Sequence, residues 1–170
     1  MRHAALAAIL ALSVALPAGA SAPGPHMPVA SFEQLRQPLP LPYDESANAD
    51  RVVAAALARA KKNGKLLLVD LGGNWCLDCR LLAGTMATEP LRSWLPRHYE
   101  LVMVDVGRFD KNLQVPRRFG MTAKLDGVPA ILVVNPRTGK LINAGHVTAL
   151  ADARSLSPQA LADWLAGWAR

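Results

Sequence analysis

The two cysteines of the chain, Cys76 and Cys79, are separated by two residues and closely follow an apolar run, Leu66 to Leu71. If that run is a strand and a helix begins at Cys76, the first sulfur lies at the helix N-terminus and the second lies one turn later on the same side. Alpha carbons at positions i and i+3 of a helical turn fall within the roughly 4.4–6.8 Å that a disulfide requires. The pair can therefore close and reopen without unfolding, which is the chemistry of a two-electron thiol switch.

The two sulfurs are expected to play different parts. Unpaired N–H groups and the positive end of the helix dipole favour the thiolate of Cys76. Cys79, one turn deeper, is expected to stay protonated until its thiolate is needed. We therefore predict that Cys76 attacks a disulfide and that Cys79 resolves the mixed disulfide.

Other uses of a cysteine pair have less support. A bridge that closes so small a loop removes little chain entropy, so it is a poor structural staple. A zinc site lacks ligands because the sequence has no second cysteine pair. Copper(I) delivery by Cys76, Cys79 and His146 stays open as an alternative function, because soft thiolates suit that ion. A surface histidine is the competing interpretation of His146.

Residues 1–20 have the pattern of a secretory signal peptide. Arg2 precedes an apolar run from Ala4 to Leu16, and small residues then lead to a cleavage site after Ala20 or Ala22. The run is too short to span a membrane. We expect a protein that is periplasmic or otherwise exported, in a compartment that permits disulfides.

Length and charge narrow the class of protein further. A chain of 170 residues with 51% hydrophobic content suits one domain with a full core. The formal net charge is +6, but the lysines and arginines are scattered and have no interleaved aromatic residues. A solvated basic face therefore explains the charge better than nucleic-acid binding does.

The remaining sequence predicts an arm followed by alternating helices and strands. Residues 21–46 are rich in proline, and we interpret them as an arm or linker, although the apolar side chains within them could pack onto the domain. The domain itself is predicted over residues 47–170. The expected elements are a helix at 47–63, a strand at 65–71, a helix from 76 that breaks at Pro90 and resumes at 91–95, a strand at 99–106, a short helix at 112–119, strands at 130–135 and 140–143, and a helix from 158 to the end.

This order of elements predicts an α/β sandwich with a mixed sheet of four to five strands flanked by helices. Crossover connections make the first strands parallel, and the last hairpin is antiparallel. Chemistry in such a sheet collects at the carboxyl ends of the strands. The cysteines stand at one of those ends.

At these residues the chain resembles the thioredoxin superfamily. The run 67–71, the turn 72–74, the segment Trp-Cys-Leu-Asp-Cys-Arg at 75–80 and the Gly-Val-Pro-Ala segment at 127–130 follow that family's pattern in order. The resemblance covers about Ala47 to Arg170 and is greatest with exported thioredoxin-like proteins and the thioredoxin-like domains of bacterial thiol-disulfide interchange proteins. It implies a thioredoxin-like three-layer sandwich and a protein-disulfide oxidoreductase that requires no cofactor.

The resemblance also assigns roles to particular positions. Val128 and Pro129 match the family's cis-proline dipeptide, which offers backbone to an extended substrate, whereas the competing interpretation is a trans proline that starts a strand. Asp70 matches a buried acid beneath the second cysteine, with a raised pKa that lets it accept the proton of Cys79 through water. An exposed aspartate at a strand end is the alternative. Trp75 is expected either to flank the substrate groove or only to pack.

Three positions depart from the family pattern. Leu77 and Asp78 stand between the cysteines in place of Gly-Pro, and the charge of Asp78 is expected to oppose the Cys76 thiolate while Arg80 favours it. Leu101 occupies a position where many thioredoxins have a lysine near the buried acid. A less stabilised thiolate makes the disulfide harder to reduce, which favours a reductase or isomerase over a strong oxidant.

The partners implied are disulfide-bearing exported proteins as clients and a membrane-embedded donor that restores the dithiol. A peptide-binding or chaperone module with an idle redox pair is a third class of function. It predicts that a Cys76→Ala variant keeps full cellular function.

Overall fold

The structure is a computed structural model that describes residues 24–169. The predicted signal peptide, residues 1–20, lies outside the described residues. Between residues 24 and 169, no helix combines the length and the apolar character that crossing a membrane requires.

A mixed sheet forms the centre of the fold. Its strands are β1 (Leu66–Gly72), β2 (Tyr99–Asp105) and β3 (Ala130–Val134), in the order β2-β1-β3. β1 pairs parallel with β2 and antiparallel with β3. Because β1 is buried along its length from residue 67 to residue 72, its continuous apolar sequence suits the central position.

The prediction of four to five strands is wrong, because the sheet has three in the described residues. The predicted strand at 140–143 is reduced to a single antiparallel bridge between Val134 and Leu141. Next to it, the side chain of Asn143 accepts a hydrogen bond from Val133 N (2.9 Å) and donates one to Ile131 O (2.7 Å). A side chain thus satisfies the edge of β3, so a regular backbone ladder does not continue there.

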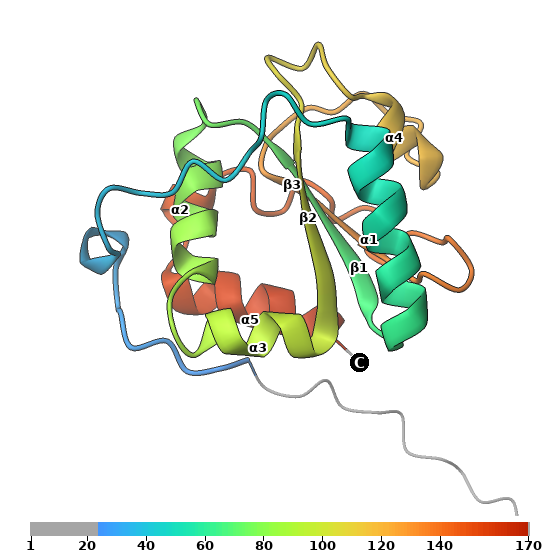
Figure 1. Ribbon diagram of the computed structural model, residues 1–170. Helices are drawn as coiled ribbons and strands as arrows, with labels where there is room; N and C mark the ends of the chain where they lie inside the picture. The colour runs from blue at the N-terminus through green and yellow to red at the C-terminus, as the bar shows by residue number, and fades with distance from the viewer. Residues whose placement is uncertain (1–23, 170) are drawn as a thin grey trace, which may run out of the picture.

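Helices cover both faces of the sheet, which confirms the predicted layers (Figure 1). One face carries α1 (Ala49–Asn63) and α4 (Gln114–Arg118), and the other carries α2 (Leu77–Met86), α3 (Leu91–His98) and α5 (Pro158–Trp168). Two short 3-10 helices, η1 (Phe32–Gln34) and η2 (Ala153–Ser155), complete the set for residues 24–169.

The helix ends follow local sequence signals. Asn48 caps α1 by accepting a hydrogen bond from Arg51 N, and Gly64 ends that helix in the left-handed conformation at φ 67°. Ser157 caps α5 in the same way, ahead of Pro158 in the first turn. These boundaries depend on neighbouring residues, so the sequence predicted them closely.

Alternation along β1 divides the core into two layers. Leu67, Val69 and Leu71 pack in the cluster that includes α1, whereas Leu68 packs in the cluster that includes α2, α3 and α5. By the same period of two, Asp70 points toward the α2 side. The strand therefore directs its one carboxylate toward the helix that carries the cysteines.

The proline-rich arm packs against the domain. It passes along the outside of α2 and crosses in front of the sheet to reach α1 (Figure 1). Leu35 and Leu39 form a small buried cluster with Leu81 of α2. Tyr43 is also buried, whereas Leu41 is exposed.

Candidate active site

The cysteines lie at the N-terminus of α2, after the turn that follows β1. Cys76 is the N-cap of α2, which begins at Leu77, one residue after the predicted helix start, and its Sγ accepts a hydrogen bond from Cys79 N at 3.1 Å. The two residues are joined by a disulfide with a Cα–Cα distance of 5.3 Å. An N–H group directed at Cys76 Sγ favours the thiolate once that disulfide is reduced. The geometry predicted for a thiol switch is therefore present.

The two cysteines differ in access to solvent. Cys76 is 5% exposed and Cys79 is fully buried. Cys76 borders a groove of about 590 Å³, which is lined by residues of α2, the loop before β3 and the loop around Thr148. A client disulfide in this groove would meet Cys76 first, in agreement with the roles predicted for the two sulfurs.

The Val128–Pro129 peptide bond is cis, as predicted, so the interpretation of a trans proline is wrong. The carbonyl oxygen of Val128 lies 3.5 Å from Cys76 Sγ. Main chain at this position faces the sulfur from the far wall of the groove. An extended client segment could pair with it while its disulfide lies at Cys76.

Asp70 is fully buried, so the interpretation of an exposed aspartate is wrong. Burial raises the pKa of this carboxyl to about 7, and a hydrogen bond from the Tyr43 hydroxyl opposes part of that increase. The hydroxyl donates to Oδ1 at 2.9 Å, while Oδ2 has no hydrogen-bond partner in the described residues. A carboxyl with a pKa near neutrality can both take up and return a proton at working pH.

Tyr43 is the residue of this site that the sequence did not point to. It comes from the arm, and its contact with Asp70 spans 27 positions. A signal was nevertheless available, because Leu101 left the buried acid without its usual basic neighbour. Leu101 is half-buried and lies opposite Leu68 in the β1–β2 register, two pairs away from the Asp70–Met103 pair.

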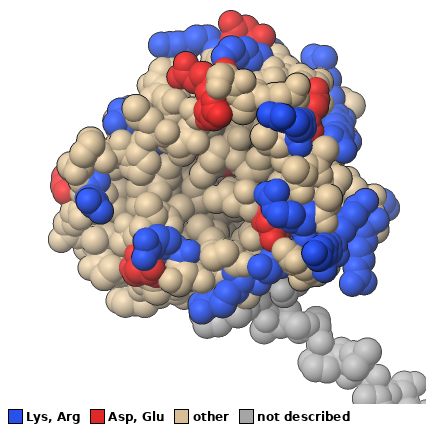
Figure 2. All heavy atoms as spheres, in the orientation of Figure 1, with Lys and Arg blue, Asp and Glu red and all other residues tan. Residues whose placement is uncertain are grey.

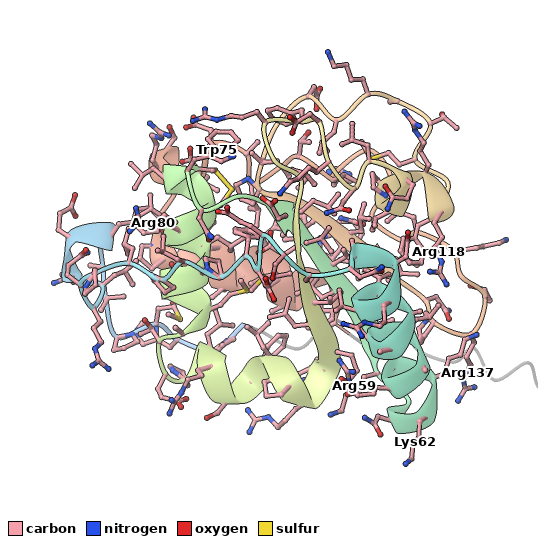
Figure 3. The ribbon with its side chains drawn as sticks, turned by 45° about the horizontal axis from the view of Figure 1, so that its top comes forward. Arg59, Lys62, Trp75, Arg80, Arg118 and Arg137 are labelled. Carbon is pink, nitrogen blue, oxygen red and sulfur yellow. A yellow bond between two sulfur atoms is a disulfide. The ribbon has the colours of Figure 1, made fainter. Side chains whose placement is uncertain are left out.

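Trp75 borders the groove beside the disulfide (Figure 3). Its side chain is 42% exposed, and Nε1 donates to Gly107 O at 2.7 Å. The guanidinium of Arg108 lies 4.2 Å from the ring centroid, and Phe109 meets the ring edge-on. These contacts fix an exposed aromatic surface next to Cys76, which suits the predicted part in binding a client segment.

The predicted effects of Asp78 and Arg80 need correction. Asp78 forms an ion pair with Arg154, whose Nε donates to Asp78 Oδ1 at 3.0 Å. Burial raises the pKa of Asp78, but the hydrogen bonds and charge of Arg154 outweigh it and hold the pKa below its ordinary value. Arg80 instead donates to the carbonyls of Leu39 (3.1 Å) and Pro40 (3.3 Å) in the arm. The charge of Asp78 is thus compensated by Arg154, and Arg80 anchors the arm.

An Arg154→Ala variant tests this compensation. Without Arg154, the carboxylate of Asp78 is unpaired close to Cys76, and we expect the pKa of the Cys76 thiol to rise by up to about one unit. The pH dependence of iodoacetamide alkylation of the reduced protein measures that pKa. Arg80→Ala is the control and should leave it unchanged. Equal values in the Arg154→Ala variant and the unaltered protein would contradict the compensation.

The structure does not bring His146 to the cysteines. Its ring is exposed and packs against Trp168 at a centroid distance of 5.7 Å. Residues 24–169 contain no group of three or more His, Cys, Asp or Glu side chains placed to hold a metal ion. The alternative copper site built from Cys76, Cys79 and His146 is therefore wrong.

The basic residues lie mostly away from the cysteines. Figure 2 shows many of them on the side of the molecule that carries α1. In Figure 3, Arg59, Lys62, Arg118 and Arg137 lie on that side, and Trp75 marks the cysteine end of α2. The positive charge is thus a property of a solvated face rather than of the groove.

Comparison with known proteins gives matches to a family profile, to a solved structure and to a curated protein. Residues 48–136 match the sequence profile of a family described as thioredoxin-like. A crystal structure titled disulphide isomerase from Xylella fastidiosa Temecula1 is 40% identical, with a TM-score of 0.68 over 75% of this chain and 96% of that one. The thiol:disulfide interchange protein DsbD 1 of Pseudomonas aeruginosa is 35% identical over 85 residues, which are 48% of this chain and 13% of that protein.

These matches agree with the geometry of the site. The profile spans β1, α2, β2 and β3, and so includes both cysteines, Asp70 and Pro129. It ends before α5 and begins after Tyr43. The disulfide at the start of α2, the cis proline opposite it and the buried acid below it therefore stand within the matched region, and the chain belongs to the thioredoxin-like family.

Proposed function

We propose that this chain is a thiol-disulfide oxidoreductase that reduces or isomerises disulfide bonds of exported proteins. One observation supports this most directly. The reactive pair is asymmetric, with Cys76 at the edge of a groove and Cys79 buried on the side of the sheet that holds a carboxyl of pKa about 7.

In the first step, the thiolate of Cys76 attacks one sulfur of a client disulfide. A disulfide forms between Cys76 and the client, and the second client sulfur leaves as a thiolate and takes a proton from water. The client segment lies in the groove between Trp75 and Val128. Its main chain is held opposite Cys76 while the bond is exchanged.

In the second step, Cys79 loses its proton to Asp70 and attacks Cys76 Sγ. The Cys76–Cys79 disulfide forms, and the remaining client sulfur leaves with the electrons of the broken bond and is protonated from solvent. Two electrons have then moved from the dithiol to the client. In isomerisation, a client thiol displaces Cys76 instead, and the dithiol is recovered unchanged.

The side chains around Cys76 favour the reducing or isomerising direction. Arg80 is turned to the arm and Arg154 is neutralised by Asp78, so neither adds positive charge beside the thiolate. A dithiol whose thiolate has less stabilisation forms a disulfide that is harder to reduce. This argues against a strong oxidant.

Turnover in this direction needs a source of electrons. A membrane-embedded donor that reduces the Cys76–Cys79 disulfide would serve, and a periplasmic location would bring donor and clients together. The name of the Pseudomonas aeruginosa relative, an interchange protein, is consistent with such a chain of transfers.

A redox titration against glutathione tests the direction. We expect a midpoint well below the roughly −120 mV of a strong oxidant, and a value at or above it would overturn the proposal. Reduction of insulin and refolding of scrambled ribonuclease then distinguish reductase from isomerase. The matched control is Cys76→Ala, which should be inactive in both assays. Full cellular function of that variant would favour a chaperone instead.

A further inference from the structure

The arm contributes a side chain to the redox centre. Tyr43 precedes the region that matches the family profile, residues 48–136, yet it is 3% exposed and its hydroxyl contacts the buried acid. We infer that Tyr43 is a positioning residue for the resolving step: it holds Asp70 so that one carboxylate oxygen is free to take the proton of Cys79. The inference depends on the role proposed for Asp70.

The turn before the cysteines holds Tyr43 in place. The side chain of Asn74 accepts a hydrogen bond from Tyr43 N at 3.1 Å and donates one to Tyr43 O at 2.8 Å. Both main-chain groups of the tyrosine are thus bound by one amide, two residues before Cys76. Any displacement of the arm at Tyr43 would therefore also displace the turn at Asn74, which precedes Cys76.

The hydroxyl of Tyr43 lies close to both the acid and the resolving sulfur. A Cβ atom on Gly72 would lie less than 3.0 Å from both Tyr43 Oη and Cys79 Sγ. Tyr43 Oη and Cys79 Sγ are therefore less than twice 3.0 Å apart. The hydroxyl also donates a hydrogen bond to Asp70 Oδ1 at 2.9 Å. The absence of a side chain at Gly72 leaves the space in which these groups meet.

The hydrogen bond gives the two oxygens of Asp70 different roles. Oδ1 is occupied by Tyr43, and Oδ2 is buried without a partner in residues 24–169. Oδ2 is thus the oxygen available to a proton. Burial and the Asp70 carboxylate raise the pKa of Tyr43 far above its ordinary value, so the phenol remains a donor throughout the working range.

The step balances without any added reactant. Cys79 gives its proton to Asp70 Oδ2, the Cys79 thiolate attacks Cys76 Sγ, and the client sulfur leaves with the bonding electrons. Tyr43 keeps its own proton and its bond to Oδ1 throughout. Because that bond favours the ionised carboxylate, its loss should make Asp70 a base only at higher pH.

A Tyr43→Phe variant of the full chain tests the inference. The reduced protein is mixed with excess 5,5′-dithiobis(2-nitrobenzoate) in a stopped-flow instrument, and the phase of thionitrobenzoate release that does not depend on reagent concentration reports attack by Cys79. Its rate should rise with pH through a midpoint near 7 in the unaltered protein. We expect the midpoint to move upward by about one unit in Tyr43→Phe. An unchanged midpoint overturns the inference.

Tyr99→Phe is the matched control. Tyr99 is the other tyrosine of the chain; it is buried, and its hydroxyl donates to Leu165 O at 2.6 Å, in the layer beneath α5. Loss of this bond should lower stability and leave the midpoint in place. Asp70→Asn separates the two proposals. If the resolving rate of that variant keeps its pH dependence, the role proposed for Asp70 is wrong. If the rate loses its pH dependence while Tyr43→Phe leaves the midpoint unchanged, the role of Asp70 stands and only the role of Tyr43 is wrong.

A second perturbation avoids any loss of packing. In the Tyr99→Phe background, 3-fluorotyrosine can be incorporated at position 43. Its more acidic phenol donates a stronger hydrogen bond, so the midpoint should move to lower pH. A midpoint that stays in place or rises would contradict the inference.

Discussion

Replacement of Cys79 by alanine is expected to stop turnover and to leave clients attached to Cys76. The resolving thiol is one helical turn from Cys76, with a Cα–Cα distance of 5.3 Å. A group held so close acts at a very high effective concentration, so its loss should slow release of the client by about 10³-fold or more. Non-reducing electrophoresis followed by mass spectrometry detects and names the trapped clients.

The control for this trapping experiment is Cys76→Ala. Cys79 is fully buried and has no access to the groove, so this variant should form no mixed disulfides. Comparable trapping by both variants would mean that the two sulfurs are interchangeable, which would contradict the assigned order of attack.

Replacement of Asp70 by asparagine is expected to stabilise the oxidised protein increasingly as pH rises. Burial raises the pKa of Asp70 from its ordinary value of 3.8 to about 7, so the folded protein keeps a proton that the unfolded chain has lost. The free energy of unfolding therefore falls between about pH 4 and pH 7, and the full penalty is present above pH 7. A shift of this size corresponds to about 4 kcal/mol as an upper value.

Guanidinium denaturation of both proteins between pH 4 and pH 8 measures this effect. Asparagine keeps an oxygen for the Tyr43 hydroxyl, so the variant differs mainly in its inability to ionise. Groups that titrate equally in both proteins cancel in the difference between their free energies of unfolding. A difference that stays constant across this range would show that the carboxyl titrates normally despite its burial.

The parts of the site that the sequence predicted are those set by neighbouring residues. Cys76 and Cys79 share one helical turn, and Asp70 interrupts a strand that is otherwise apolar, so its burial follows from the run around it. Pro129 is indicated by its place before a strand and by its match to the family pattern. The helix boundaries at Asn48, Gly64 and Ser157 were likewise local.

The parts that the sequence did not predict depend on contacts between distant residues. The bond from Tyr43 to Asp70 spans 27 positions, and the ion pair of Asp78 with Arg154 spans 76. Neither has a spacing that a periodic pattern could reveal. The missing fourth strand has a similar cause, because the side chain of Asn143 takes over bonds that backbone was expected to make.

The anchoring of Leu39 and Pro40 by Arg80 has a practical consequence for protein engineering. A fragment cut at the start of α1, where the family profile begins, would retain both cysteines and the cis proline Pro129. It would nevertheless leave a gap over α2 and expose Asp70 to water on the side that Tyr43 covers. Grafting this centre into another scaffold therefore requires the arm as well as the domain.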